Sequence, residues 1–164
     1  MTQDTIERVL MSFRTGRLAA LAVACAALAV GILSASAGAA DLDVSLSMSR
    51  NSKVVHIRAG DAMGIAPLVL RVHVGDRVVF VDDDVKQHHT ATGLTGASAF
   101  VDDPRWTDAS LKAYGQIGPE AWSTGDLAPG ARSAPLVAAK PGTYLYGCFF
   151  HYTAGMRGEI IVEP

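Results

Sequence analysis

The sequence has little cysteine and little net charge. Its 164 residues include only Cys25 and Cys148, and 14 Lys and Arg residues against 16 Asp and Glu give a formal net charge of -2. That balance excludes the basic face on which nucleic-acid binding depends. The chain also lacks a Gly-rich phosphate-binding loop and a Gly-x-Ser-x-Gly nucleophile motif. We therefore expect no nucleic-acid partner.

Hydrophobic residues make up 49% of the chain, and much of the excess lies near the start. Residues 18–33 are apolar except for Gly31, basic residues precede them, and small residues fill positions 34–40. This order is typical of a secretory signal peptide. We predict a signal peptide over residues 1–40, cleaved after Ala39 or Ala40, and one domain over residues 41–164. The domain is then periplasmic or secreted.

Two alternatives remain open for this leader. Residues 18–40 are together long enough to cross a bilayer, so an uncleaved leader would act as a membrane anchor. The true start can be Met1 or Met11, because residues 11–17 already supply a short basic region. In either case Cys25 belongs to the leader, and Cys148 is the cysteine of the exported domain. A single cysteine in an oxidising compartment is usually paired between chains, buried or bound to a metal.

The rest of the chain reads as short strands separated by Gly, Pro and Asp. Residues 42–48 alternate between apolar and polar, which is typical of a half-buried strand. Further strands are expected over residues 53–58, 68–74, 78–81, 143–148 and 159–162. The pattern predicts an all-β fold, an antiparallel sandwich or barrel. Residues 93–123 interrupt it, and we expect a loop there with a short helix near residues 109–114, covering one side of the sandwich.

The strongest chemical motif places three donor side chains within nine residues. Cys148, His151 and Met156 offer a thiolate, an imidazole and a thioether between two predicted strands. Soft sulfur ligands with imidazole select copper, and a trigonal His2Cys set with a weak axial Met is a blue-copper site. The second imidazole must come from elsewhere, and His88 and His89 follow the strand at residues 78–81.

With these motifs the chain resembles the cupredoxins of the plastocyanin, pseudoazurin and amicyanin group. The matching segments are residues 66–80, 89–92, 124–130, 141–148 and 156–158. The resemblance implies a Greek-key β-sandwich or barrel with one type 1 copper ion. It makes the copper ligands His89, Cys148, His151 and Met156.

Two details of the resemblance concern the upstream segment. Counting from Asp84 puts His88 in the ligand register, whereas counting back from Thr90 puts His89 there. We favour His89, which keeps Thr90 polar and Ala91 in the core. In the family, the residue at the position of Thr90 ties the two ligand-bearing segments together by hydrogen bonds.

Other conspicuous residues have simpler interpretations. His56 and His73 are expected on strand faces, and Trp106 and Trp122 in packing contacts. Residues 82–84, three aspartates, are expected to form a solvated turn, although they could also act as an acidic docking patch. Phe149, Phe150 and Tyr152 either form an exposed docking surface around His151 or pack beneath the ligand loop.

The resulting hypothesis is a monomeric one-electron carrier. Redox partners of the cytochrome, dehydrogenase or oxidase type would dock weakly near His151. The alternative is a periplasmic copper-binding or delivery module. An enzyme is not expected, because related copper enzymes connect their two copper centres through a histidine beside the cysteine, and Cys148 has Gly147 and Phe149 as neighbours. Membrane association is expected only if the leader is retained.

Overall fold

The computed structural model describes residues 41–164, and the predicted signal peptide lies outside the described residues. The elements of this part are short strands and two 3-10 turns. They are β1 (Asp41–Leu46), β2 (Val55–Ile57), β3 (Gly60–Ala62), β4 (Ile65–Ala66), β5 (Val69–His73), β6 (Arg77–Asp82), β7 (Thr92–Gly93), η2 (Asp108–Leu111), β8 (Ala113–Tyr114), β9 (Ser123–Thr124), β10 (Leu136–Val137), β11 (Gly142–Gly147), η3 (Tyr152–Ala154) and β12 (Arg157–Glu163). Within residues 41–164, no helix has the length and apolar character that a membrane crossing requires.

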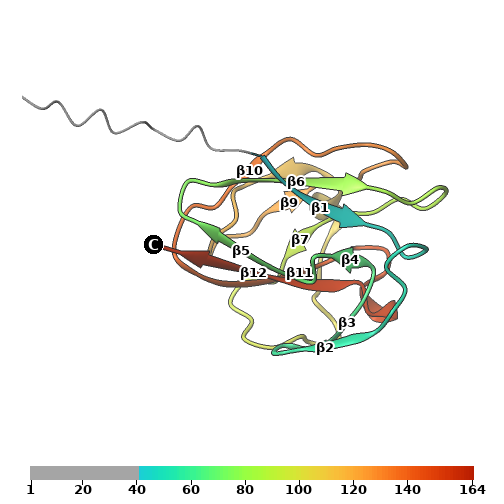
Figure 1. Cartoon of the computed structure of the whole chain (residues 1–164), viewed down its shortest axis with the longest axis horizontal. Helices are drawn as coiled ribbons and strands as arrows, with labels where there is room; N and C mark the ends of the chain where they lie inside the picture. Colours follow the sequence, from blue (N-terminus) through green and yellow to red (C-terminus); the bar gives the residue numbers. More distant parts are fainter. Residues whose placement is uncertain (1–40) are drawn as a thin grey trace, which may run out of the picture. The chain divides into compact units, whose positions relative to one another are not determined.

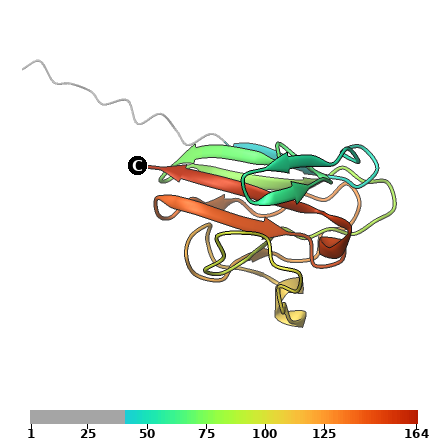
Figure 2. The ribbon, with the colours of Figure 1, turned by 90° about the horizontal axis from the view of Figure 1, so that it is seen from below.

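Two sheets form the sandwich that the sequence predicts (Figures 1 and 2). One has the strand order β10-β6-β1-β4, the other the order β5-β12-β11-β7-β9-β8, and β2 and β3 form a separate hairpin. The predicted sandwich is confirmed, but two of its pairings differ from the antiparallel pattern: β1 runs parallel to β6, and β12 runs parallel to β5. The tight turn at Gly75 explains this difference. It joins β5 and β6, which belong to different sheets, so each of these strands pairs with a partner distant in sequence.

The core between the sheets is built from the alternating apolar residues of the strands. Val44 and Leu46 of β1 are fully buried. Phe80, Trp122 and Tyr146 contact one another, with ring centroids 5.4 to 6.2 Å apart. Large buried aromatic rings contribute much of the stability of such a core. Trp122 is thus a packing residue, as predicted.

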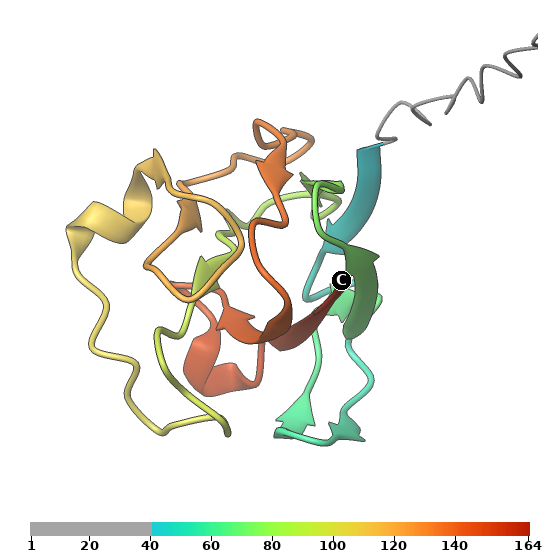
Figure 3. The same cartoon turned by 90° about the vertical axis from the view of Figure 1, so that its left-hand side faces the viewer.

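The segment over residues 93–123 extends the larger sheet at its edge. It contributes η2, β8 and the start of β9, and in Figure 3 η2 (yellow) lies on the far side of the molecule from β1. The helix expected near residues 109–114 is a single 3-10 turn that ends at Leu111. Ala113 and Tyr114 pair instead with β9 as β8, so sheet pairing replaces the second half of the expected helix.

The segments that carry the predicted metal ligands meet at one end of the sandwich. In Figure 1 the loop after β6 and the turn η3 both lie at the end opposite the C-terminus. A backbone bridge ties each of these segments to a third one: His89 pairs with Leu127, and Met156 pairs with Met63. Backbone hydrogen bonding therefore fixes the positions of the segments that carry the candidate ligands.

Candidate metal centre

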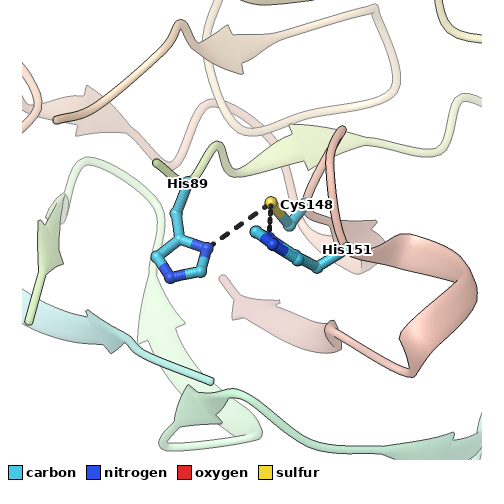
Figure 4. Close-up of side chains that lie close together, drawn as sticks. All are labelled: His89, Cys148 and His151. Atoms are coloured by element: carbon cyan, nitrogen blue, oxygen red, sulfur yellow. Dashed lines mark hydrogen bonds between the residues drawn. The ribbon is translucent and has the colours of Figure 1, made fainter. Parts of the chain in front are cut away.

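Three of the predicted ligands, His89, Cys148 and His151, lie close together (Figure 4). Cys148 directly follows β11, and His151 precedes η3. His89 lies between β6 and β7, where its backbone N–H donates to the Leu127 carbonyl at 3.0 Å and its carbonyl accepts from the Leu127 N–H at 2.9 Å. Two of the three donors thus stand at the end of the larger sheet, and the third is anchored by a backbone bridge.

The spacing of the donor atoms fits one metal ion. Cys148 Sγ lies 3.7 Å from His89 Nδ1 and 3.5 Å from His151 Nδ1, and all three atoms lie within 4.8 Å of one another. An ion about 2.0 Å from each nitrogen and about 2.3 Å from the sulfur, with tetrahedral or trigonal angles, separates the sulfur from each nitrogen by about 3.5–3.7 Å. A thiolate with two imidazoles is the donor set expected for copper.

Met156 lies in the same loop as Cys148 and His151 and is fully buried. Its carbonyl accepts the Cys148 N–H at 3.0 Å, and its N–H donates to the His151 carbonyl at 3.1 Å. Gly155 lets the chain turn from η3 toward β12, since its φ of 96° is unfavourable for other residues. Coordination by the Met156 thioether remains a prediction from the resemblance.

The structure separates the two adjacent histidines. The His89 ring is completely buried and faces Cys148. The His88 side chain is 50% exposed, and its Nδ1 lies 2.9 Å from Asp126 Oδ1. His88 therefore lies outside the donor cluster, and the register counted from Thr90 describes the chain better than the one counted from Asp84.

Residues 82–84 do not form the solvated turn that we expected. Asp82 ends β6 and is buried, and Asp84 is also buried. Burial favours the neutral acid, but the N–H groups of Val85 and Ser49 and the His89 ring hydrogen-bond the carboxylate and lower the pKa of Asp84 to about 2. The prediction of an exposed turn rested on three consecutive charged residues. It was wrong because hydrogen bonds from distant segments stabilise the buried Asp84 carboxylate.

Thr90 connects the two ligand-bearing segments as the resemblance implied. Its backbone N–H points to Cys148 Sγ at 3.5 Å, and its Oγ1 accepts the Phe149 N–H at 2.9 Å. The thiolate position thus depends on the segment that also carries His89.

A family model for copper-binding proteins of the plastocyanin/azurin family matches residues 51–163. The chain belongs to this family. A comparison with curated proteins gives no match. Similar solved structures include auracyanin B, 23% identical, covering 76% of this chain and 88% of that chain with a TM-score of 0.50. Others are an auracyanin from Roseiflexus castenholzii (20% identity, 76% and 97% covered, TM-score 0.49) and a purple cupredoxin from Nitrosopumilus maritimus (20% identity, 75% and 100% covered, TM-score 0.47).

Burial sets the protonation of this cupredoxin's donors. It raises the pKa of the Cys148 thiol, against opposing hydrogen bonds from backbone N–H groups such as that of Thr90. It lowers the pKa of both His89 and His151. At neutral pH both imidazoles are thus uncharged, with a nitrogen lone pair free for a metal. Copper binding would deprotonate the thiol and release its proton.

The outer side of the cupredoxin's ligand loop packs against the 93–123 segment, a contact that the sequence did not reveal. The Trp106 and Tyr152 rings meet edge to face at 5.2 Å, and the Trp106 indole N–H donates to the Gly93 carbonyl at 3.2 Å. Arg157 lies 4.3 Å from the Tyr152 ring centre on its face. Of the loop aromatics, Tyr152 therefore packs beneath the loop, whereas Phe150 is 42% exposed.

The remaining conspicuous histidines lie away from the cupredoxin's donor cluster. His56 belongs to β2 and His73 to β5, and the side chains are 78% and 68% exposed. The strand-face interpretation of both is thus confirmed. Their acidic neighbours lie at the surface as well: Asp61 beside His56, and Asp76 and Glu163 beside His73.

Proposed function

We propose that this plastocyanin/azurin-family protein is an exported one-electron carrier. The observation that carries the proposal is the unequal exposure of the donors: His89 and Cys148 are buried, whereas the His151 ring is only half-buried. Bound copper supplies a one-electron Cu(I)/Cu(II) couple. Burying two donors keeps solvent away from the metal, and the exposed edge of His151 gives a redox partner a short route to it.

The residues around His151 support docking of a partner there. The centre of the Phe150 ring lies 6.3 Å from that of the His151 ring, and Phe150 is 42% exposed, so an apolar group lies beside the half-buried imidazole. A small apolar contact suits a brief, weak encounter, as electron carriers require. The partner would be a cytochrome, dehydrogenase or oxidase, and the protein would act as a monomer in the periplasm or outside the cell.

Copper delivery and catalysis receive less support. A thiolate fixed by the Thr90 and Met156 backbones favours retention of the metal over its release. Members of this family are mostly electron carriers rather than enzymes. The Cys148 neighbours, Gly147 and Phe149, also offer no imidazole to a second copper centre.

The test begins with the copper-loaded protein. We expect intense blue absorption from thiolate-to-Cu(II) charge transfer, and its complete loss in Cys148→Ala. Thr153→Ala, an exposed change in the same loop, is the matched control and should keep the colour. A colourless Cu(II) protein, or a blue Cys148→Ala variant, would refute the proposal.

Stopped-flow mixing of the reduced protein with an oxidised c-type cytochrome then measures electron exchange. Fast exchange is expected, and Phe150→Ser should slow it without changing the absorption spectrum. Rapid copper transfer to a copper-binding acceptor protein, with no electron exchange, would favour delivery instead.

A further inference from the structure

The two nitrogens of the His89 ring have different partners. Nδ1 lies 3.7 Å from Cys148 Sγ, and Nε2 lies 3.4 Å from Asp84 Oδ2. The exposed fractions of the His89 and Asp84 side chains are 0% and 3%. A neutral ring that offers Nδ1 to a metal carries its proton on Nε2. The Asp84 carboxylate can accept a hydrogen bond from this N–H.

The Asp84 carboxylate is held independently of His89. Oδ1 accepts the Val85 N–H at 2.8 Å, and Oδ2 faces the Ser49 N–H at 3.3 Å and the Ser47 hydroxyl at 3.4 Å. These donors come from the segments that follow β1 and β6, two neighbouring strands of one sheet. The acceptor is therefore already in position before the histidine ring adopts any particular orientation.

His151 has a different environment. Its Nδ1 faces Cys148 Sγ, but among residues 41–164 no carboxylate lies within ion-pair distance of its ring. The negative charge of Asp84 thus acts on His89 within hydrogen-bond distance and on His151 only from farther away. It does so in a buried site, where water screens the charge weakly.

We infer that Asp84 is a positioning and tuning residue of the copper centre. It holds His89 in the tautomer that presents Nδ1, and its charge stabilises Cu(II) more than Cu(I), which lowers the reduction potential. A carboxylate behind a metal-binding histidine fixes the ring and raises its basicity. Because Cu(II) carries one more positive charge than Cu(I), the buried carboxylate attracts it more strongly. The inference rests on the copper binding assumed in the proposed function.

The test replaces Asp84 by the isosteric amide. In Asp84→Asn, Cu(II) affinity should fall about 10–100-fold, as for other groups that orient a metal-binding histidine. Cu(I) affinity should fall less, and the reduction potential should rise by about 59 mV for each tenfold difference between the two losses. Asp126→Asn is the matched control. It removes the same charge from the neighbouring, exposed His88–Asp126 pair and should leave both affinities unchanged.

A second measurement uses the wild-type chain, so it does not depend on whether the variant folds. In the diamagnetic Cu(I) protein labelled with 15N, NMR should show a proton on His89 Nε2, shifted downfield and protected from exchange by the carboxylate. A His89 ring protonated on Nδ1, or a rapidly exchanging Nε2 proton, would overturn the inference.

The outcomes separate this inference from the proposed function. A wild-type protein that lacks blue absorption refutes the proposed function. A blue wild-type protein whose Asp84→Asn variant has the same potential as Asp126→Asn refutes the role of Asp84 and leaves the electron carrier intact.

Discussion

The two imidazoles of the donor cluster belong to regions that are built differently. His89 is buried, bridges Leu127 through its backbone, and faces Asp84 with its second nitrogen. His151 is half-buried and lies in a short loop whose only regular element is one 3-10 turn. The His89 side of the centre is thus built to hold the metal, and the His151 side lies nearer the surface.

This contrast extends to what surrounds each region. The His89 region is supported by polar contacts, from Asp84 and Thr90. The His151 loop is supported on its outer side by apolar and cation-π contacts, through Tyr152 with Trp106 and Arg157. Changes to either region should therefore have different consequences.

The largest expected effect comes from removing each imidazole in turn. His89→Gly and His151→Gly should both lose the blue absorption, because each leaves the copper with one imidazole fewer. Adding free imidazole should restore it in His151→Gly, where the vacated position opens to solvent. Restoration should fail in His89→Gly, because the replaced ring is completely buried. Visible absorption against imidazole concentration is the measurement, and equal rescue of both variants would remove the contrast.

The next effect tests the link between the two regions. Thr90→Val keeps the side-chain shape but removes the acceptor of the part-buried Phe149 N–H and the buried hydroxyl partner of Thr92. Leaving a buried polar group unpaired costs about 1–3 kcal/mol. We expect a lower free energy of unfolding for the copper-free protein and a broadened blue absorption band. Thr153→Val, exposed in the same loop, is the control and should change stability by less than about 0.5 kcal/mol. Equal effects from both substitutions would show that Thr90 does not join the regions.

Much of the His151 side could be predicted from sequence because its determinants are local. Cys148, His151 and Met156 fall within nine residues between two strands, so the chain path alone brings them near one another. The strand after this loop follows from the β-branched run of β12. The Trp106 contact with Tyr152 could not be predicted, because it joins segments 46 positions apart with no shared pattern.

The environment of His89 depends on contacts that sequence patterns do not encode. Asp84 is buried because Ser49, 35 residues earlier, supplies a hydrogen bond to its carboxylate. The parallel pairing of β1 with β6 likewise arises where the chain passes from one sheet to the other. The one available signal was the position of Asp84 five residues before His89, which we interpreted as a guide to register rather than as a contact.

The smallest expected effect is a loss of local stability in the His151 loop that leaves the His89 segment unchanged. Trp106→Ala removes the edge-to-face contact with Tyr152, which is worth about 0.5–1.5 kcal/mol beyond the area it buries. The loss should appear locally, as faster amide hydrogen exchange at Gly155, whose N–H donates to the Tyr152 carbonyl in the loop, while exchange at the Leu127–His89 bridge stays unchanged. Tyr114→Ala, an exposed aromatic of the same 93–123 segment, is the control and should alter neither site. Faster exchange at both sites in Trp106→Ala would mean that the His89 segment and the His151 loop open together. The two regions would then differ in solvent exposure but not in local stability.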